Sequence, residues 1–97
     1  MDRDESLDRL RRVQPELTHR FGVKRLLLFG STARNEARPG SDVDLLVEFE
    51  GPATFDGYFG LLHYLETLLG RPVDLVTPRS LPERLRGMIE HEAIDVT

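Results

Sequence analysis

The chain has 97 residues, with 17 acidic against 13 basic side chains, a net charge of −4 and no cysteine. This length predicts one domain over residues 1–97, and the lack of cysteine excludes disulfides and thiolate metal sites. The acidic balance argues against direct binding to a nucleic acid backbone. No apolar run approaches the roughly 18 residues of a membrane span, and the charged N-terminus leads into no signal-peptide core. We therefore expect a cytoplasmic protein that does not enter a membrane.

The N-terminal stretch predicts a helix that a proline interrupts. Apolar side chains recur at helical spacing over residues 5–21. Because Pro15 lies inside this repeat, we expect a kink, or a break that puts Pro15 in the first turn of a second helix. Gly22 is expected to end the helical segment.

Two apolar runs predict neighbouring strands. Residues 23–29 are too short and too closely bounded for a helix, and they are typical of a strand buried on both faces. A short helix over 31–36, capped by Ser31 or Thr32, and a polar turn lead to a second strand at 43–49. The simplest arrangement is an antiparallel pair.

The next stretch predicts a long helix and a third strand. Thr54 is expected to cap a helix over 55–69, which Gly70 ends. The aromatic and leucine side chains of this helix follow the helical repeat and are expected to lie in the core: Phe55, Tyr58, Phe59, Leu61, Leu62, Leu65, Leu68 and Leu69. Residues 73–76 form a strand in which Asp74 interrupts an apolar run, and a carboxylate buried there would need a partner.

The C-terminal stretch predicts one more helix. Ser80 and Glu83 form a capping-box pattern, with Pro82 tolerated in the first turn. Residues 90–92 are expected to be exposed, and residues 93–96 suit a short terminal strand. The buried face of the helix should consist of Leu81, Leu85, Met88 and Ile89. Together the elements predict an α/β fold of the α+β type, a small mixed sheet flanked by helices.

Polar residues with related chemistry fall on the three predicted strands. Gly30 and Ser31 end the first strand, and Asp42 and Asp44 open the second. Asp74 lies within the third. Carboxylates on alternate residues of a strand project from one face, about 6.5–7 Å apart, and antiparallel pairing would bring Ser31 beside them.

These residue types point to a metal–nucleotide site. Carboxylates without a lysine among them repel one another unless a cation lies there, and Mg²⁺ takes oxygen ligands while leaving positions for phosphates. Two such ions about 3.5–4 Å apart would serve in-line displacement at phosphorus. Gly30 would let the backbone approach a phosphate, and Ser31 would donate hydrogen bonds to it.

Arg34 has two interpretations. It stands one turn into the short helix, from which its guanidinium could reach the same phosphates. It could equally pair with Glu36 or Glu48, and the sequence leaves both open.

Other kinds of site are disfavoured. His19, His63 and His91 fall on different predicted helices without the spacing of metal ligands. The phosphate-binding pattern Gly-x-x-x-x-Gly-Lys-Ser/Thr does not occur in the chain.

Residues 28–34 (LFGSTAR) followed by 41–47 (SDVDLLV) resemble the minimal nucleotidyltransferase (MNT) domains of the DNA polymerase β-like nucleotidyltransferase superfamily. The likeness extends from the leading helix to the strand with Asp74. It implies the polymerase β-like fold, nucleotide triphosphate as substrate and two Mg²⁺ ions as cofactors.

The resemblance also assigns roles to the residues at the motif positions. Gly30 and Ser31 would hold the triphosphate, and Asp42 and Asp44 would coordinate the two ions. Asp74 would bind the catalytic ion and help to deprotonate the attacking hydroxyl. All these positions are filled, so the resemblance implies an intact site.

Free-standing MNT proteins often act as antitoxins to HEPN-family ribonuclease toxins. The resemblance therefore implies transfer of AMP from ATP to a hydroxyl, a tyrosine of a partner HEPN toxin. The alternative is a non-catalytic antitoxin that neutralises its partner by forming a complex. Exposed helix faces also leave a homodimer open.

Overall fold

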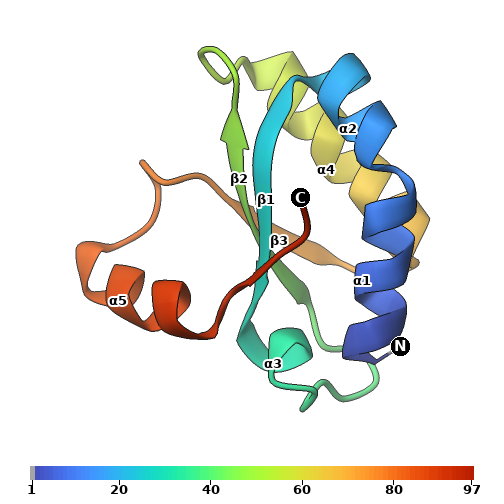
Figure 1. The fold of residues 1–97 in the computed structure, drawn as a ribbon, viewed down its shortest axis with the longest axis vertical. Helices are drawn as coiled ribbons and strands as arrows, with labels where there is room; N and C mark the ends of the chain where they lie inside the picture. The colour runs from blue at the N-terminus through green and yellow to red at the C-terminus, as the bar shows by residue number, and fades with distance from the viewer. Residues whose placement is uncertain (1) are drawn as a thin grey trace.

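The computed structural model describes residues 2–97, which form a four-stranded sheet with helices on both faces (Figure 1). Three helices, α1, α2 and α4, line one side of the sheet, and α5 stands on the other side. The elements in chain order are α1 (Arg3–Arg12), α2 (Gln14–Phe21), β1 (Val23–Phe29), α3 (Gly30–Ala33), β2 (Val43–Phe49), α4 (Phe55–Leu69), β3 (Val73–Val76), α5 (Glu83–Glu92) and β4 (Ile94–Asp95).

The sheet is mixed, as the sequence predicts. Its strand order is β3-β2-β1-β4, with β1 antiparallel to both β2 and β4, and β2 parallel to β3. The helix α4 connects the parallel strands β2 and β3. Such a crossover is needed because a tight hairpin turn can join only antiparallel strands. The predicted strands at 23–29, 43–49 and 73–76 and the antiparallel pairing of the first two are confirmed.

The N-terminal helix is broken at the predicted proline. Pro15 lies in the first turn of α2. Backbone N–H groups in that turn have no intrahelical acceptor, so the helix loses no hydrogen bond when proline lacks the N–H. Gly22 follows α2 with φ +65°, a left-handed conformation that ends the helix. Gly70 ends α4 in the same way, and the Thr54 hydroxyl caps α4 by accepting the Gly57 N–H at 3.0 Å.

Two apolar clusters hold the layers together. The larger lies between the sheet and the helices α1, α2 and α4, and contains alternate strand residues such as Leu26, Leu28 and Leu45. The smaller lies beneath α5, where Leu27 and Leu46 of the opposite face meet Ile89. Leu26 to Leu28 are thus buried on both faces, as expected for the first strand.

Three residues expected in the core are exposed. Phe55 and Phe59, in the first part of α4, are 77% and 49% exposed, and Met88 of α5 is 52% exposed. The buried residues of α4 are Leu61, Leu65 and Leu69, farther along the helix. The first turns of α4 are covered on one side, because Tyr58 packs against the larger cluster. At 3.6 residues per turn, Phe55 and Phe59 lie about 80° and about 120° around the helix from Leu65, so the predicted stripe is wider than the face that is buried.

Two predicted helix caps are wrong. α5 begins after Pro82 without a side-chain cap, and the Ser80 hydroxyl instead bonds the Thr77 carbonyl at 3.1 Å. α3 begins at Gly30, so neither Ser31 nor Thr32 caps it. Ser80 lies inside a turn that its hydroxyl helps to close, and Ser31 and Thr32 lie inside α3. None of the three therefore directly precedes a helix, as a capping residue must.

Within residues 2–97, no helix combines the length and the apolar character needed to cross a membrane.

Candidate active site

The pairing of β2 with β3 brings two of the predicted carboxylates together. Asp44 and Asp74 are direct partners in the parallel register. The residues on either side of each, such as Leu45 and Leu75, belong to the cluster beneath α4. Because side chains alternate along a strand, both carboxylates point to the opposite face of the sheet, the one on which α5 stands.

Asp42 and Asp74 are exposed, whereas Asp44 is half-buried. Asp42 lies just before β2, two residues from Asp44. Asp74 is exposed at this edge of the sheet, so it does not need the protein partner that a buried carboxylate would need.

Gly30 packs directly against the carboxylate of Asp44. The end of β1 lies beside the start of β2, where Phe29 pairs with Asp44. Gly30 has φ +73°, and a Cβ added to it would overlap Asp44 Oδ2 and lie 2.9 Å from Asp44 Cγ. Only glycine combines this backbone conformation with so close an approach.

Ser31 is half-buried, next to Gly30 in α3, and its carbonyl accepts the Glu36 N–H at 2.8 Å. The neighbouring Thr32 is buried, and its hydroxyl has no hydrogen-bond partner among residues 2–97. The segment that joins β1 to β2 thus holds two hydroxyls beside Gly30.

Arg34 pairs with two carboxylates. Its Nε donates to Glu36 Oε2 at 2.9 Å, and its Nη1 lies 3.2 Å from both carboxylate oxygens of Glu92. These bonds to Glu36 and Glu92 raise the pKa of the guanidinium. The predicted pair with Glu36 is present.

Glu92, at the end of α5, is a member of this group that the sequence does not reveal. Its Oε1 also accepts the backbone N–H of Gly30 at 3.2 Å. The prediction that residues 90–92 are exposed is wrong for Glu92, whose side chain is 19% exposed. No local signal could have found it, because 62 residues separate it from Gly30.

Burial and neighbouring carboxylates together raise the pKa of Asp44. Burial raises the pKa of Asp44 from 3.8 to about 6, and the nearby charges of Asp74, Asp42 and Glu92 act in the same direction. Arg34 opposes them, and its effect is smaller than those of burial, Asp74 and Asp42. The site is therefore a cluster of negative charge that favours a proton or a cation.

This charge predicts that Asp44 destabilises the folded protein at neutral pH. The folded state holds the Asp44 proton more tightly than the unfolded state, so stability should fall as pH rises from about 4 to about 6. The full shift would be worth about 3 kcal/mol, and partial exposure reduces this to about 1 kcal/mol. Urea unfolding without divalent cations should show that Asp44→Asn gains this amount above pH 6 and nearly nothing at pH 4. A difference from wild type that does not vary with pH would contradict the prediction.

The donor set suits a hard cation. All nearby ligating side chains are carboxylates, but no group of three or more within residues 2–97 is gathered closely enough to hold a metal by itself. Mg²⁺ is usually held by one or two carboxylates together with substrate phosphates and water. Asp42, Asp44 and Asp74 fit that mode better than a preformed cage.

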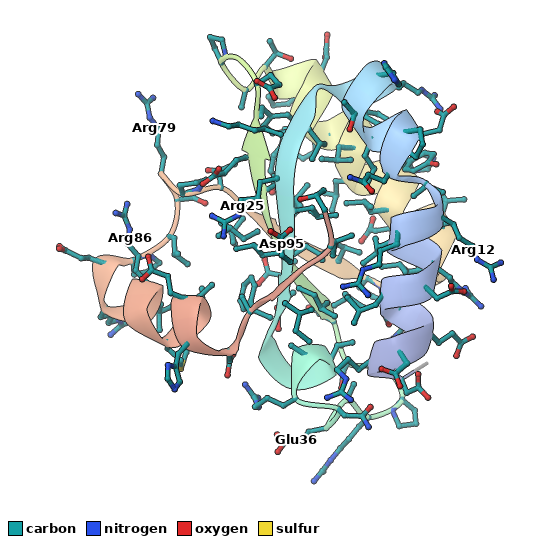
Figure 2. All side chains as sticks on the ribbon, viewed as in Figure 1. Arg12, Arg25, Glu36, Arg79, Arg86 and Asp95 are labelled. Atoms are coloured by element: carbon teal, nitrogen blue, oxygen red, sulfur yellow. The ribbon has the colours of Figure 1, made fainter. Side chains whose placement is uncertain are left out.

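The carboxylates lie outside the hollow beneath α5. This hollow of about 380 Å³ is lined by Arg25 and Leu27 of β1 and by Arg86 and Ile89 of α5, among others. Figure 2 shows Arg86 on α5 and Arg25 near Asp95 on the sheet, where Arg25 Nε lies 3.8 Å from an Asp95 oxygen. The predicted site is instead on the open surface at the other end of β1, beside α3.

Comparison with known proteins identifies relatives along nearly the whole chain. Residues 10–96 match the family described as "Nucleotidyltransferase domain". A candidate protein adenylyltransferase of Methanocaldococcus jannaschii is 45% identical over 87 residues, which cover 89% of this chain and 91% of the relative. Protein adenylyltransferase MntA of Thermococcus cleftensis is 43% identical over 81 residues, covering 84% and 82%.

Solved structures share the fold. One described as a candidate minimal nucleotidyltransferase superposes with a TM-score of 0.81 at 46% identity, covering 97% of this chain and 95% of the other. A complex of a tri-AMPylated Shewanella oneidensis HEPN toxin with its MNT antitoxin gives 0.68 at 18% identity, covering 98% and 71%. The latter identity supports the fold alone. The chain belongs to the nucleotidyltransferase domain family, as a minimal nucleotidyltransferase enzyme.

Proposed function

We propose that the protein transfers AMP from ATP to a hydroxyl of a partner protein, a tyrosine of a HEPN-family toxin, and thereby acts as an antitoxin. The observation that carries the proposal is the direct pairing of Asp44 with Asp74 beside Gly30. Relatives named protein adenylyltransferases, 45% and 43% identical, support the choice of AMP and of a protein acceptor. The choice of a HEPN partner rests on the resemblance of residues 28–34 and 41–47 to the MNT domains.

Each residue has a defined task in this reaction. Gly30 and Ser31 bind the triphosphate, with Arg34 as a further phosphate contact. Asp74 accepts the proton of the acceptor hydroxyl, whose oxygen forms a bond to the α-phosphorus. The bond from that phosphorus to the β-phosphate oxygen breaks, and pyrophosphate leaves. The chain contributes mainly by positioning these groups and by balancing charge.

Asp42, Asp44 and Asp74 would hold Mg²⁺, with two ions as the full complement. When bound, Mg²⁺ offsets the charge of the carboxylates and the phosphates and polarises the reacting phosphoryl group. The raised pKa of Asp44 supports this assignment, because a cation relieves the repulsion that causes part of the shift.

The open position of the carboxylates favours an acceptor on a large molecule. Asp42 and Asp74 are exposed, and the 380 Å³ hollow beneath α5 does not include them. Pockets for small molecules usually enclose most of their ligand. A hydroxyl presented by another protein needs no such enclosure.

The proposal predicts label transfer that depends on a divalent cation. We expect ³²P from α-labelled ATP, but not from γ-labelled ATP, to appear on a partner protein of the HEPN family. EDTA should abolish the transfer, and excess Mg²⁺ should restore it. Gel electrophoresis followed by mass spectrometry of the labelled protein would identify the modified side chain.

The alternative function is neutralisation by complex formation alone. The exposed aromatic side chains Phe55 and Phe59 favour it, since their rings form a tilted pair at the surface with centroids 4.6 Å apart. In the same assay, this alternative predicts full inhibition of the toxin's ribonuclease activity without any transfer of label. That outcome would contradict the adenylyl-transfer proposal.

A further inference from the structure

Glu92 is a charged side chain in the candidate active site, but the reaction proposed above gives it no role. It ends α5, on the face of the sheet that carries Asp44 and Asp74. Its Oε1 accepts the Gly30 N–H at 3.2 Å. Both of its carboxylate oxygens lie 3.2 Å from Arg34 Nη1. The backbone donor and the guanidinium that converge on this carboxylate come from the segment between β1 and β2.

We propose that Glu92 occupies the phosphate position of the nucleotide site in the free enzyme, so that an incoming triphosphate must displace it. The inference rests on the proposed function, in which Gly30 and Arg34 bind phosphate. A carboxylate and a phosphate are both anionic acceptors that prefer N–H and guanidinium donors. An N–H directed at one cannot also make a well-aligned bond to the other.

The surroundings of Glu92 favour displacement over a permanent pair. Arg34 has a second carboxylate partner, Glu36 at 2.9 Å, so displacement of Glu92 need not leave the guanidinium without an ion pair. Glu92 is the last residue of α5, and helix ends open more readily than helix interiors. The negative charges of Glu92 and Asp44 also repel each other. The Glu92 carboxylate therefore keeps its position against this repulsion. A bound phosphate would add to that repulsion.

Displacement has a measurable consequence for affinity. When only a fraction of the molecules has the phosphate position open, the apparent dissociation constant is the intrinsic one divided by that fraction. If Glu92 closes the position in about nine molecules of ten, removing its charge should tighten nucleotide binding about tenfold.

The test measures binding of AMP-PNP with Mg²⁺ by isothermal titration calorimetry to wild type, Glu92→Gln and Glu36→Gln. Glu36→Gln is the matched control, because Glu36 also pairs with Arg34 but is not the carboxylate that holds the Gly30 N–H. We expect about tenfold tighter binding for Glu92→Gln and less than about twofold for Glu36→Gln. In turnover assays, Glu92→Gln should lower KM for ATP without lowering kcat. Glu92→Ala, which removes the acceptor altogether, should bind at least as tightly.

The possible outcomes separate this inference from the proposed function. Wild-type binding that Glu92→Gln leaves unchanged or weakens would overturn the inference while the proposed function stands. An equal gain in both glutamine variants would also overturn it, because the effect would then be one of net charge. If none of these proteins binds AMP-PNP, the proposed function fails and the inference fails with it. Binding detected only in the Glu92 variants would support the inference.

Discussion

Replacing Asp42 and Asp44 together by asparagine is expected to slow AMP transfer on the order of 10³-fold or more, with the fold intact. Asparagine has nearly the same shape as aspartate but cannot supply the negative charge that holds a cation against the triphosphate. Asp44 also lies in contact with Gly30 and opposite Asp74, so it links the phosphate-binding segment to the proposed base. Initial rates of transfer from α-labelled ATP measure the effect.

The control for this variant is Asp4→Asn/Asp8→Asn. It changes the net charge by the same amount, on exposed side chains of α1, and its rate should stay close to that of wild type. Unfolding of the Asp42→Asn/Asp44→Asn variant is not expected to explain its loss of activity, because neutralising Asp44 should stabilise the fold above pH 6. A variant that keeps more than about a tenth of the wild-type rate would contradict the assignment of the two aspartates.

Local patterns in the sequence were sufficient to predict the strands and the placement of most candidate site residues, whose roles remain predictions. The apolar run from Leu26 to Leu28 is buried on both faces, and such a run has few alternatives to a central strand. Gly30 directly follows β1, and Asp44 lies near the start of β2. An antiparallel pairing of these two strands therefore brings Gly30 beside Asp44. Asp74 joined them because β3 lies next to β2 in register.

The width of a buried helix face could not be predicted in this way. A period of 3.6 residues identifies the direction of the inward face of α4, but not how far around the helix the neighbouring elements reach. Tyr58 packs against the larger cluster, whereas Phe55 and Phe59 lie about 80° and about 120° around the helix from Leu65. Both phenylalanines therefore fall in the broad predicted stripe and remain exposed.

Glu92 illustrates a second limit. Its position depends on how α5 folds back against α3, and that contact joins segments about sixty residues apart. The residues 90–92 look like any polar helix end. Only the structure reveals that the carboxylate of Glu92 meets the N–H of Gly30, a residue that the sequence does identify.

Replacing Gly30 by alanine should lower the rate of transfer on the order of 10²-fold and reduce stability by about 1–3 kcal/mol. Two separate effects contribute. The φ of +73° strains any residue with a Cβ, and the added methyl would overlap the Asp44 carboxylate, which must then move from its position. A displacement of about 1 Å at a reacting group is enough for a loss of this size. Urea unfolding and initial rates measure the two effects.

Gly40→Ala separates the backbone effect from the contact with Asp44. Gly40 also has a positive φ, +85°, but a Cβ added there meets nothing within 4 Å. Its alanine variant should lose stability from strain alone, about 1–2 kcal/mol, and keep a rate near that of wild type. If both variants lost activity equally, strain in the segment between β1 and β2 would account for the result. If Gly30→Ala alone loses activity, the position of the Asp44 carboxylate against Gly30 is what the reaction requires.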